Sequence, residues 1–167
     1  TMPDYNPYTI KRCKDCDMNN GKMELVFVPE NELCAACKLV RELAKADAKQ
    51  TRAAAKPLQG TIIRNTHFHH DVNITGTSIR EWTNQPHKHF KAKNQMLLDI
   101  NNVFSNAAYL GTTDNHKGIK RVVQSHIFEV EVSGEKNLLI VREYDWGEYV
   151  LHSISDSPEL YNKIKKE

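Results

Sequence analysis

Residues 125–155, SHIFEVEVSGEKNLLIVREYDWGEYVLHSIS, decide the expected fold. Three segments of this stretch are rich in β-branched and aromatic residues and alternate between apolar and polar side chains, which predicts short strands. These segments are residues 125–132, 137–144 and 148–155. Ser133-Gly134-Glu135 and Asp145-Trp146-Gly147 separate them and predict tight hairpin turns. With residues 107–110 as a further strand, we expect a four-stranded antiparallel sheet.

The sequence before these strands predicts two helices. Ser78, followed three residues later by Glu81, fits a capping box and predicts a short helix over residues 78–84. Pro86 suits the first turn of a second helix that runs to about Asn106. Because the helices come first and the antiparallel strands follow, the expected fold class is α+β.

Four cysteines near the N-terminus form two C-x-x-C pairs, Cys13 with Cys16 and Cys34 with Cys37. Four thiolates suit a tetrahedral Zn²⁺ ion, and a full cysteine shell is typical of a structural site. We therefore expect one structural zinc ion per chain, with a redox disulfide or an iron–sulfur cluster as alternatives. A strand over residues 23–28 and a helix over residues 33–55 complete the expected zinc module.

All four cysteines precede residue 40, whereas all eight histidines lie between residues 67 and 152. This separation predicts a zinc module over residues 1–57, a connector over 58–76 and an α+β domain over 77–167. The formal net charge of only +2 does not indicate a class of partner, so a nucleic-acid role requires a local basic patch. No apolar run spans a bilayer and residues 1–10 contain no apolar leader, so we expect a cytoplasmic protein without a membrane partner.

The histidines allow several kinds of site. His67, His69 and His70 form an H-x-H-H segment that can bind a metal or lie solvated in a loop. His126 shares a strand face with Phe128, which suits either a satisfied core-edge histidine or a catalytic one. Arg142 shares a face with Leu138 and Ile140, where a charge is costly unless it is paired. Its expected partner is either a carboxylate or a ligand phosphate.

Two resemblances add to this reading. The cysteine module resembles a treble-clef zinc finger, but its hairpin, MELVFV at residues 23–28, lacks the catalytic histidine of related nucleases. Residues 74–155, through TGTSIREW, KHFKAKNQMLLDINNVFSNAAYLG, HIFEVEVSGEKNLLIVRE and GEYVLHSIS, resemble the phage-borne branch of the barnase–EndoU–colicin–RelE-like nucleases. That resemblance implies two helices, a four-stranded antiparallel sheet and a metal-independent ribonuclease acting as a toxin or host-takeover effector.

The polar positions of the resembling motifs give the candidate catalytic residues. They are Ser78, Lys88, His89, His126, Arg142, His152 and Ser153. His suits proton transfer near neutral pH, so His126 and His152 are the acid–base candidates, with the His116 loop as another source. Arg142 and Lys88 are the expected phosphate clamps. Ser78 and Ser153 are expected to orient the substrate.

The leading hypothesis is an endoribonuclease of a phage or mobile element that cleaves RNA, with transfer RNA as one candidate. Its zinc module would serve for targeting or docking, and a phage structural protein or a cognate inhibitor is a further expected partner. Its expected place is the host cytoplasm, reached by synthesis there or by delivery from the virion. The alternatives are a non-enzymatic module that binds nucleic acid or a phage protein, and a metal-dependent nuclease that uses the H-x-H-H segment.

Overall fold

The chain divides into two units, Thr1–Ala46 and Asp47–Glu167. The structure is a computed structural model that describes residues 8–11, 26–29 and 35–165. In the first unit, β1 (Tyr8–Lys11) pairs antiparallel with β2 (Val26–Pro29), which overlaps the predicted strand over residues 23–28. Cys13, Cys16 and Cys34 lie outside the described residues, and Cys37 lies in helix α1.

Helix α1 (Ala35–Ala55) matches the predicted helix, because alanine, leucine, lysine, arginine and glutamate favour helical backbone. Pro57 follows it within a 3₁₀ turn, η1 (Lys56–Leu58). The last turns of α1 belong to the second unit and are anchored there. Asp47 accepts a hydrogen bond from the Asn94 amide at 2.7 Å, and Arg52 donates to the Asn84 side chain at 3.0 Å.

The second unit contains a six-stranded mixed sheet, so the predicted four-stranded antiparallel sheet is wrong in strand number and direction. Its order is β3-β4-β8-β7-β6-β5. The bounds are β3 Ile62–Ile63, β4 Val72–Asn73, β5 Ala108–Asp114, β6 Val122–Val132, β7 Glu135–Tyr144 and β8 Tyr149–Ser155. The four predicted strands are present and antiparallel, but β4 pairs parallel with β8 and extends the sheet. Two-residue strands such as β3 and β4 are too short to produce a period in the sequence.

The helices of this unit differ from the prediction in their ends. They are α2 (Gly76–Asn84), α3 (Phe90–Leu98), α4 (Ile100–Asn106) and α5 (Pro158–Lys163). Thr75 caps α2 in a capping box with Ser78, whereas the prediction paired Ser78 with Glu81. The predicted helix over residues 86–106 is divided at Asp99, whose backbone angles of φ −113° and ψ 27° are not helical. Aspartate favours such breaks because its side chain competes for local hydrogen bonds.

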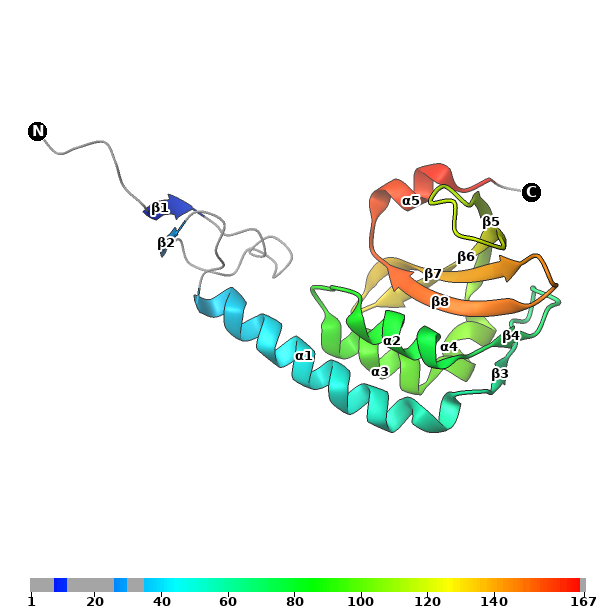
Figure 1. Ribbon diagram of the computed structural model, residues 1–167, viewed down its shortest axis with the longest axis horizontal. Coiled ribbons are helices and arrows are strands. Elements are labelled where there is room, and N and C mark those ends of the chain that lie inside the picture. The colour runs from blue at the N-terminus through cyan, green and yellow to red at the C-terminus, as the bar shows by residue number, and fades with distance from the viewer. Residues whose placement is uncertain (1–7, 12–25, 30–34, 166–167) are drawn as a thin grey trace, which may run out of the picture. The chain divides into compact units, whose positions relative to one another are not determined.

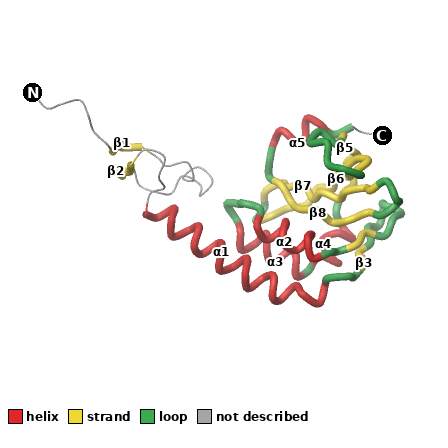
Figure 2. Tube along the Cα trace, viewed as in Figure 1, coloured by secondary structure: helices red, strands yellow, loops and turns green. Residues whose placement is uncertain are grey.

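Helices α2, α3 and α4 lie on one face of the sheet, and α5 lies on the other (Figure 1). Figure 2 shows the strands as a yellow layer between these helices. The core lies under α2–α4, where Trp82, Leu97 and Phe104 pack with strand residues such as Phe128 and Val141. We call this side of the sheet the helix-covered face and the opposite side the open face.

The C-terminal segment returns to the free edge of β5, the last strand of the sheet. Lys165 bridges to Thr112, with backbone hydrogen bonds of 2.7 Å and 3.1 Å. Gly111 has φ +134°, and a Cβ atom there would clash with the Lys165 carbonyl oxygen. Only glycine fits both demands. This contact fixes the segment after α5 beside the loop over residues 115–121.

Candidate active site

The open face of the sheet contains a pocket of about 440 Å³ that is lined in part by residues of α5 and of the 115–121 loop. We call it the Arg142 pocket. Its polar lining combines cations or imidazoles with hydroxyl groups, and its apolar floor includes Ile127 and Ile140. The polar residues are Thr113, Asn115, His116, Lys117, Ser125, Arg142, His152, Ser155, Ser157 and Lys163, with the carboxylates Asp114 and Glu159.

Arg142 lies on β7 directly opposite Ser125 of β6, on the same face as Ile140. Its side chain is half-buried. Within the described part of the chain, no hydrogen bond or ion pair engages its guanidinium group, so the predicted carboxylate partner is not found there. A partly desolvated cation without a protein partner is the arrangement that favours an anionic ligand.

His152 reaches the same pocket through an irregularity in β8. The pairing shifts between Ile140 and Val141 of β7, so Ser153 pairs with Ile140 while Leu151 pairs with Val141. His152 is the extra, unpaired residue of this β-bulge. Because of the extra residue, the side chains before and after the bulge no longer alternate between the two faces in one regular series. His152 therefore shares a pocket with Val150 but not a face with Ile154, which is buried in the core.

The surroundings of His152 keep its ring neutral. Burial, together with the positive charges of Arg142 and Lys117, lowers the pKa of His152 to about 4. No hydrogen bond to its ring nitrogens is present among residues 35–165. At neutral pH the imidazole is therefore an unprotonated base beside two cations, and an anion bound between them would raise its pKa.

The loop over residues 115–121 supplies the positive side of the pocket. His116 and Lys117 line it, and both are exposed. Asn115 fixes the loop, because its side chain accepts from the Ile119 amide at 2.9 Å and donates to the Val122 carbonyl at 3.0 Å. Asp114 is neutralised by Lys165 at 2.9 Å, which lowers the pKa of that carboxyl.

His126 lies on the helix-covered face, away from the Arg142 pocket. It is 6% exposed and packs among Phe68, Tyr109 and Tyr149. One ring nitrogen contacts the Tyr109 hydroxyl at 2.9 Å and the other lies 2.7 Å from Glu143. Burial opposes ionisation of Glu143, but hydrogen bonds from His126 and Gln124 outweigh it and lower the pKa of Glu143. His126 thus occupies the core-edge position that the sequence allowed, with both nitrogens engaged.

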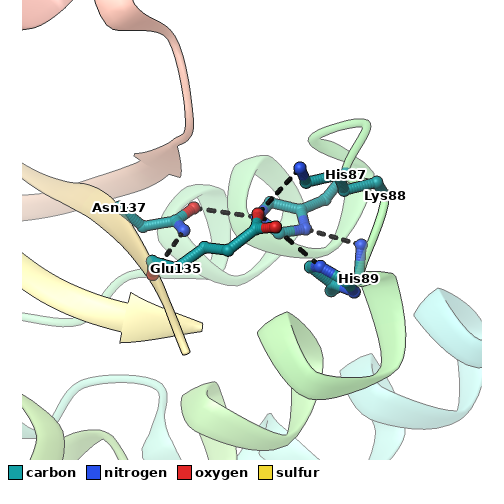
Figure 3. A network of polar contacts seen from close by, with 5 residues as sticks. All are labelled: His87, Lys88, His89, Glu135 and Asn137. Carbon is teal, nitrogen blue, oxygen red and sulfur yellow. Dashed lines mark hydrogen bonds and ion pairs between the residues drawn. The ribbon is translucent and has the colours of Figure 1, made fainter. Parts of the chain in front are cut away.

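Lys88 and His89 form a separate cluster before α3 (Figure 3). Lys88 pairs with Glu135 at 2.8 Å, and His89 lies 3.6 Å from the same carboxylate. His87 is buried, contacts Asn137 at 2.8 Å and accepts a hydrogen bond from the His89 backbone amide. This bond fixes the His87 tautomer with its proton on Nε2. Lys88 and His87 are bonded within the cluster, whereas the buried Nε2 of His89 has no hydrogen-bond partner among the described residues. The cluster does not line the Arg142 pocket.

The two predicted serines have different surroundings. Ser78 is 1% exposed and completes the α2 cap with Thr75. Ser153 is 5% exposed and lies opposite Ile140 in the sheet. Neither lines the Arg142 pocket, although Ser78 lines an adjoining one. Of the seven candidates, Arg142 and His152 line the Arg142 pocket, and Ser78 joins these two only in the adjoining pocket.

The H-x-H-H segment does not form a cluster of ligands. His67 and His69 are exposed, and His70 stacks on Tyr149 with ring centroids 4.2 Å apart. Within residues 35–165, no group of three or more histidine, cysteine, aspartate or glutamate side chains is arranged to bind a metal ion. The zinc site at Cys13, Cys16, Cys34 and Cys37 stays a prediction, since three of its ligands lie outside the described residues.

Sequence reasoning missed the hydroxyls and cations that complete the Arg142 pocket. Ser125 begins the predicted strand that carries His126, and its place opposite Arg142 follows only from the strand register. Lys117 follows His116, the loop histidine that the sequence did single out. Alternation along residues 122–127 could have indicated that Ser125 and His126 point to opposite faces.

The family model described as large polyvalent protein-associated domain 3 matches residues 42–160. The chain belongs to this family. It is a phage-associated domain family, which agrees with the phage part of the resemblance. Comparison with curated proteins and with solved structures gave no match. Among the described residues, no helix has the length and apolar character needed to cross a membrane.

Proposed function

We propose that the Arg142 pocket is the active site of a metal-independent endoribonuclease of phage or mobile-element origin. The strongest support is that Arg142 and a neutral His152 line the same open pocket. Arg142 forms no hydrogen bond or ion pair with the described residues. A phosphodiester placed there would meet a cation and a base at the same time. The phage-associated family is consistent with such an effector.

The proposed reaction uses the ribose 2′-hydroxyl as nucleophile. His152 accepts the 2′ proton, the 2′ oxygen attacks phosphorus, and the bond to the 5′ oxygen breaks as that oxygen takes up a proton. The products are a 2′,3′-cyclic phosphate and a 5′-hydroxyl end. Arg142 and Lys117 stabilise the negative charge that develops on the phosphorane oxygens. His116 replaces His126 as the proposed acid, because it lines the pocket and His126 does not.

The test is cleavage of transfer RNA and bulk RNA by the full-length protein in excess EDTA, with the ends analysed for 2′,3′-cyclic phosphate. Arg142→Ala should lower the rate about 10²- to 10³-fold, the usual effect of removing a donor to a developing anion. Arg64→Ala is the matched control, because Arg64 is exposed and pairs with Asp71 outside the pocket. Absence of cleavage by the wild-type protein, or equal rates for the two variants, would overturn the proposal.

A further inference from the structure

A second pocket of about 280 Å³ adjoins the Arg142 pocket, and Arg142 and His152 line both. Tyr144 and Trp146 also line this second pocket, and we call it the Trp146 pocket. Tyr144 lies two residues beyond Arg142 on the same strand, so the two side chains emerge from one face roughly 7 Å apart. A ligand bound at Arg142 can therefore extend onto the aromatic pair.

Trp146 is exposed and Tyr144 is half-buried, and a closed turn holds the two rings together. Trp146 is 53% exposed, and its ring stacks on Tyr144 with centroids 4.6 Å apart at an interplanar angle of 28°. The turn that carries Trp146 is closed by hydrogen bonds from the Tyr144 amide to Glu148 and from the Gly147 amide to Tyr144, at 2.9 Å and 3.0 Å. Gly147 has φ +91°, a backbone conformation that favours glycine. Tyr144 covers part of the Trp146 ring, and the exposed remainder is available to a ligand.

Arg121 joins this aromatic pair to the loop that lines the Arg142 pocket. Its guanidinium carbon lies 5.2 Å from the Trp146 ring centroid, and its Nε donates to Asp145 at 3.1 Å. The same loop contains His116, Lys117 and Lys120, all exposed. The loop is thus the local basic patch that a nucleic-acid role requires. It lines the Arg142 pocket and contacts Trp146 through Arg121.

We propose that the Trp146 pocket binds an unpaired nucleobase of the RNA strand whose phosphate lies at Arg142, which makes single-stranded RNA the substrate class. Bases stack on aromatic side chains and on arginine planes whatever their sequence, as in single-strand binding sites. A paired base in a duplex keeps its faces stacked on its neighbours and cannot enter. This inference rests on the proposed function for the identity of the strand, but its binding step does not depend on cleavage.

The experiment uses a 2′-O-methyl RNA oligonucleotide, which cannot be cleaved because its 2′ oxygen is blocked. Three probes are titrated into the full-length protein: the single strand, the same strand annealed to its complement, and a strand with abasic sites. Tryptophan fluorescence reports binding, since Trp146 is exposed and Trp82, the other tryptophan, is fully buried. The single strand should quench the signal and bind more tightly than either of the other probes.

The variants isolate stacking from charge. Trp146→Leu should weaken binding of the single strand by about 5- to 150-fold, the range for loss of one stacked base. Trp146→Phe keeps an aromatic face and should restore most of the affinity, measured by fluorescence anisotropy of a labelled strand. Circular dichroism of both variants should match the wild type, because the side chain is exposed.

The outcomes separate this inference from the proposed function. Equal affinity of Trp146→Leu and wild type, or equal binding of the duplex or abasic probes, would overturn the nucleobase site. Binding that depends on Trp146 without cleavage of unmodified RNA would support the nucleobase site and overturn the ribonuclease. Cleavage that is unaffected by Trp146→Leu would leave the ribonuclease standing and overturn the site.

Discussion

The two faces of the sheet treat their polar side chains differently. On the helix-covered face, His126 has a partner on each ring nitrogen, and Lys93, at 1% exposure, donates to the carbonyls of Trp82 and Gln85. On the open face, neither Arg142 nor His152 has a side-chain hydrogen bond among the described residues. Polar groups that stabilise a fold are satisfied within it, whereas groups that bind a ligand are left available.

The same difference separates the surroundings of two strand histidines, His126 and His152. His126 and His152 both lie on strands beside apolar residues, and the sequence offered them equally as proton-transfer groups. The structure gives His126 the Tyr109 hydroxyl and the Glu143 carboxylate, while His152 faces two cations. The positive charges of Arg142 and Lys117 beside His152 support the anion site that we propose on this side of the sheet.

The largest expected effect separates these two histidines by activity. His152→Ala should lower RNA cleavage about 10²- to 10⁴-fold, the usual contribution of a general acid or base, and leave the unfolding midpoint nearly unchanged. His126→Ala should do the reverse, with a loss of about 1–3 kcal/mol in the free energy of unfolding, because Glu143 and Tyr109 lose a buried partner. Initial rates and urea unfolding curves measure the two effects.

The rates are compared at a temperature where circular dichroism shows both variants folded. If His126→Ala abolishes cleavage while it remains folded, or if His152→Ala cleaves at the wild-type rate, the distinction between the two faces fails.

The second prediction compares packing on the two faces. Phe128→Ala on the helix-covered face should destabilise the protein by about 3–5 kcal/mol, because a fully buried ring leaves a cavity beneath Phe104. Ile140→Ala on the open face should cost about 1 kcal/mol, since Ile140 is only half-buried at the pocket floor. Urea unfolding checks both values, and a smaller loss for Phe128→Ala than for Ile140→Ala would show that the core has been placed on the wrong face.

Strands and helices long enough to show a period were predictable from the sequence. The strands β6, β7 and β8 lie where alternation places them, and α1 lies where helix formers place it. Helix α2 overlaps the predicted helix, but its cap is Thr75 and not Ser78. Misplaced ends have local causes. Asp99 divides a helix that looks continuous by its apolar stripe, and Pro86 stands before α3 rather than in its first turn. Periodicity is averaged over many residues and does not detect a single break.

The site depended on register, which the sequence does not contain. One extra residue in β8 directs His152 to the open face and returns Ile154 to the core. Strict alternation along β8 would place His152 and Ile154 on one face, and the bulge prevents this. The pairing of Arg142 with Ser125 and the return of Lys165 to Thr112 likewise join residues far apart in the chain. Such contacts follow from tertiary packing and not from local pattern.

A third prediction concerns the buried lysine of the helix-covered face. Lys93→Met keeps a side chain of similar length and removes the donors to the carbonyls that end α2. We expect a loss of about 1–3 kcal/mol in the free energy of unfolding, because those carbonyls become buried and unsatisfied. Lys91→Met is the matched control, since Lys91 is exposed on the same helix and its replacement should change stability little. Equal thermal midpoints for the two variants would contradict the capping role of Lys93.

The smallest expected effect is in the pH dependence of stability, and it again separates the two faces. Burial lowers the pKa of His87 from 6.5, and burial with the Arg142 and Lys117 charges lowers the pKa of His152 to about 4. Below pH 6.5 the unfolded chain therefore binds more protons than the folded chain. The contribution of each neutral histidine to the free energy of unfolding is complete above that pH and is lost as the pH falls below it. His152→Gln should reduce this acid-induced loss by on the order of 1 kcal/mol, allowing for solvent screening. Phosphate at matched ionic strength should reduce the share of the acid-induced loss in unfolding free energy that is due to His152, because an anion at Arg142 raises the pKa of His152. The share that is due to His87, obtained by comparing the wild type with His87→Gln, should not change. Equal phosphate effects on both histidines, measured by urea unfolding across this pH range, would show that the open face does not bind the anion.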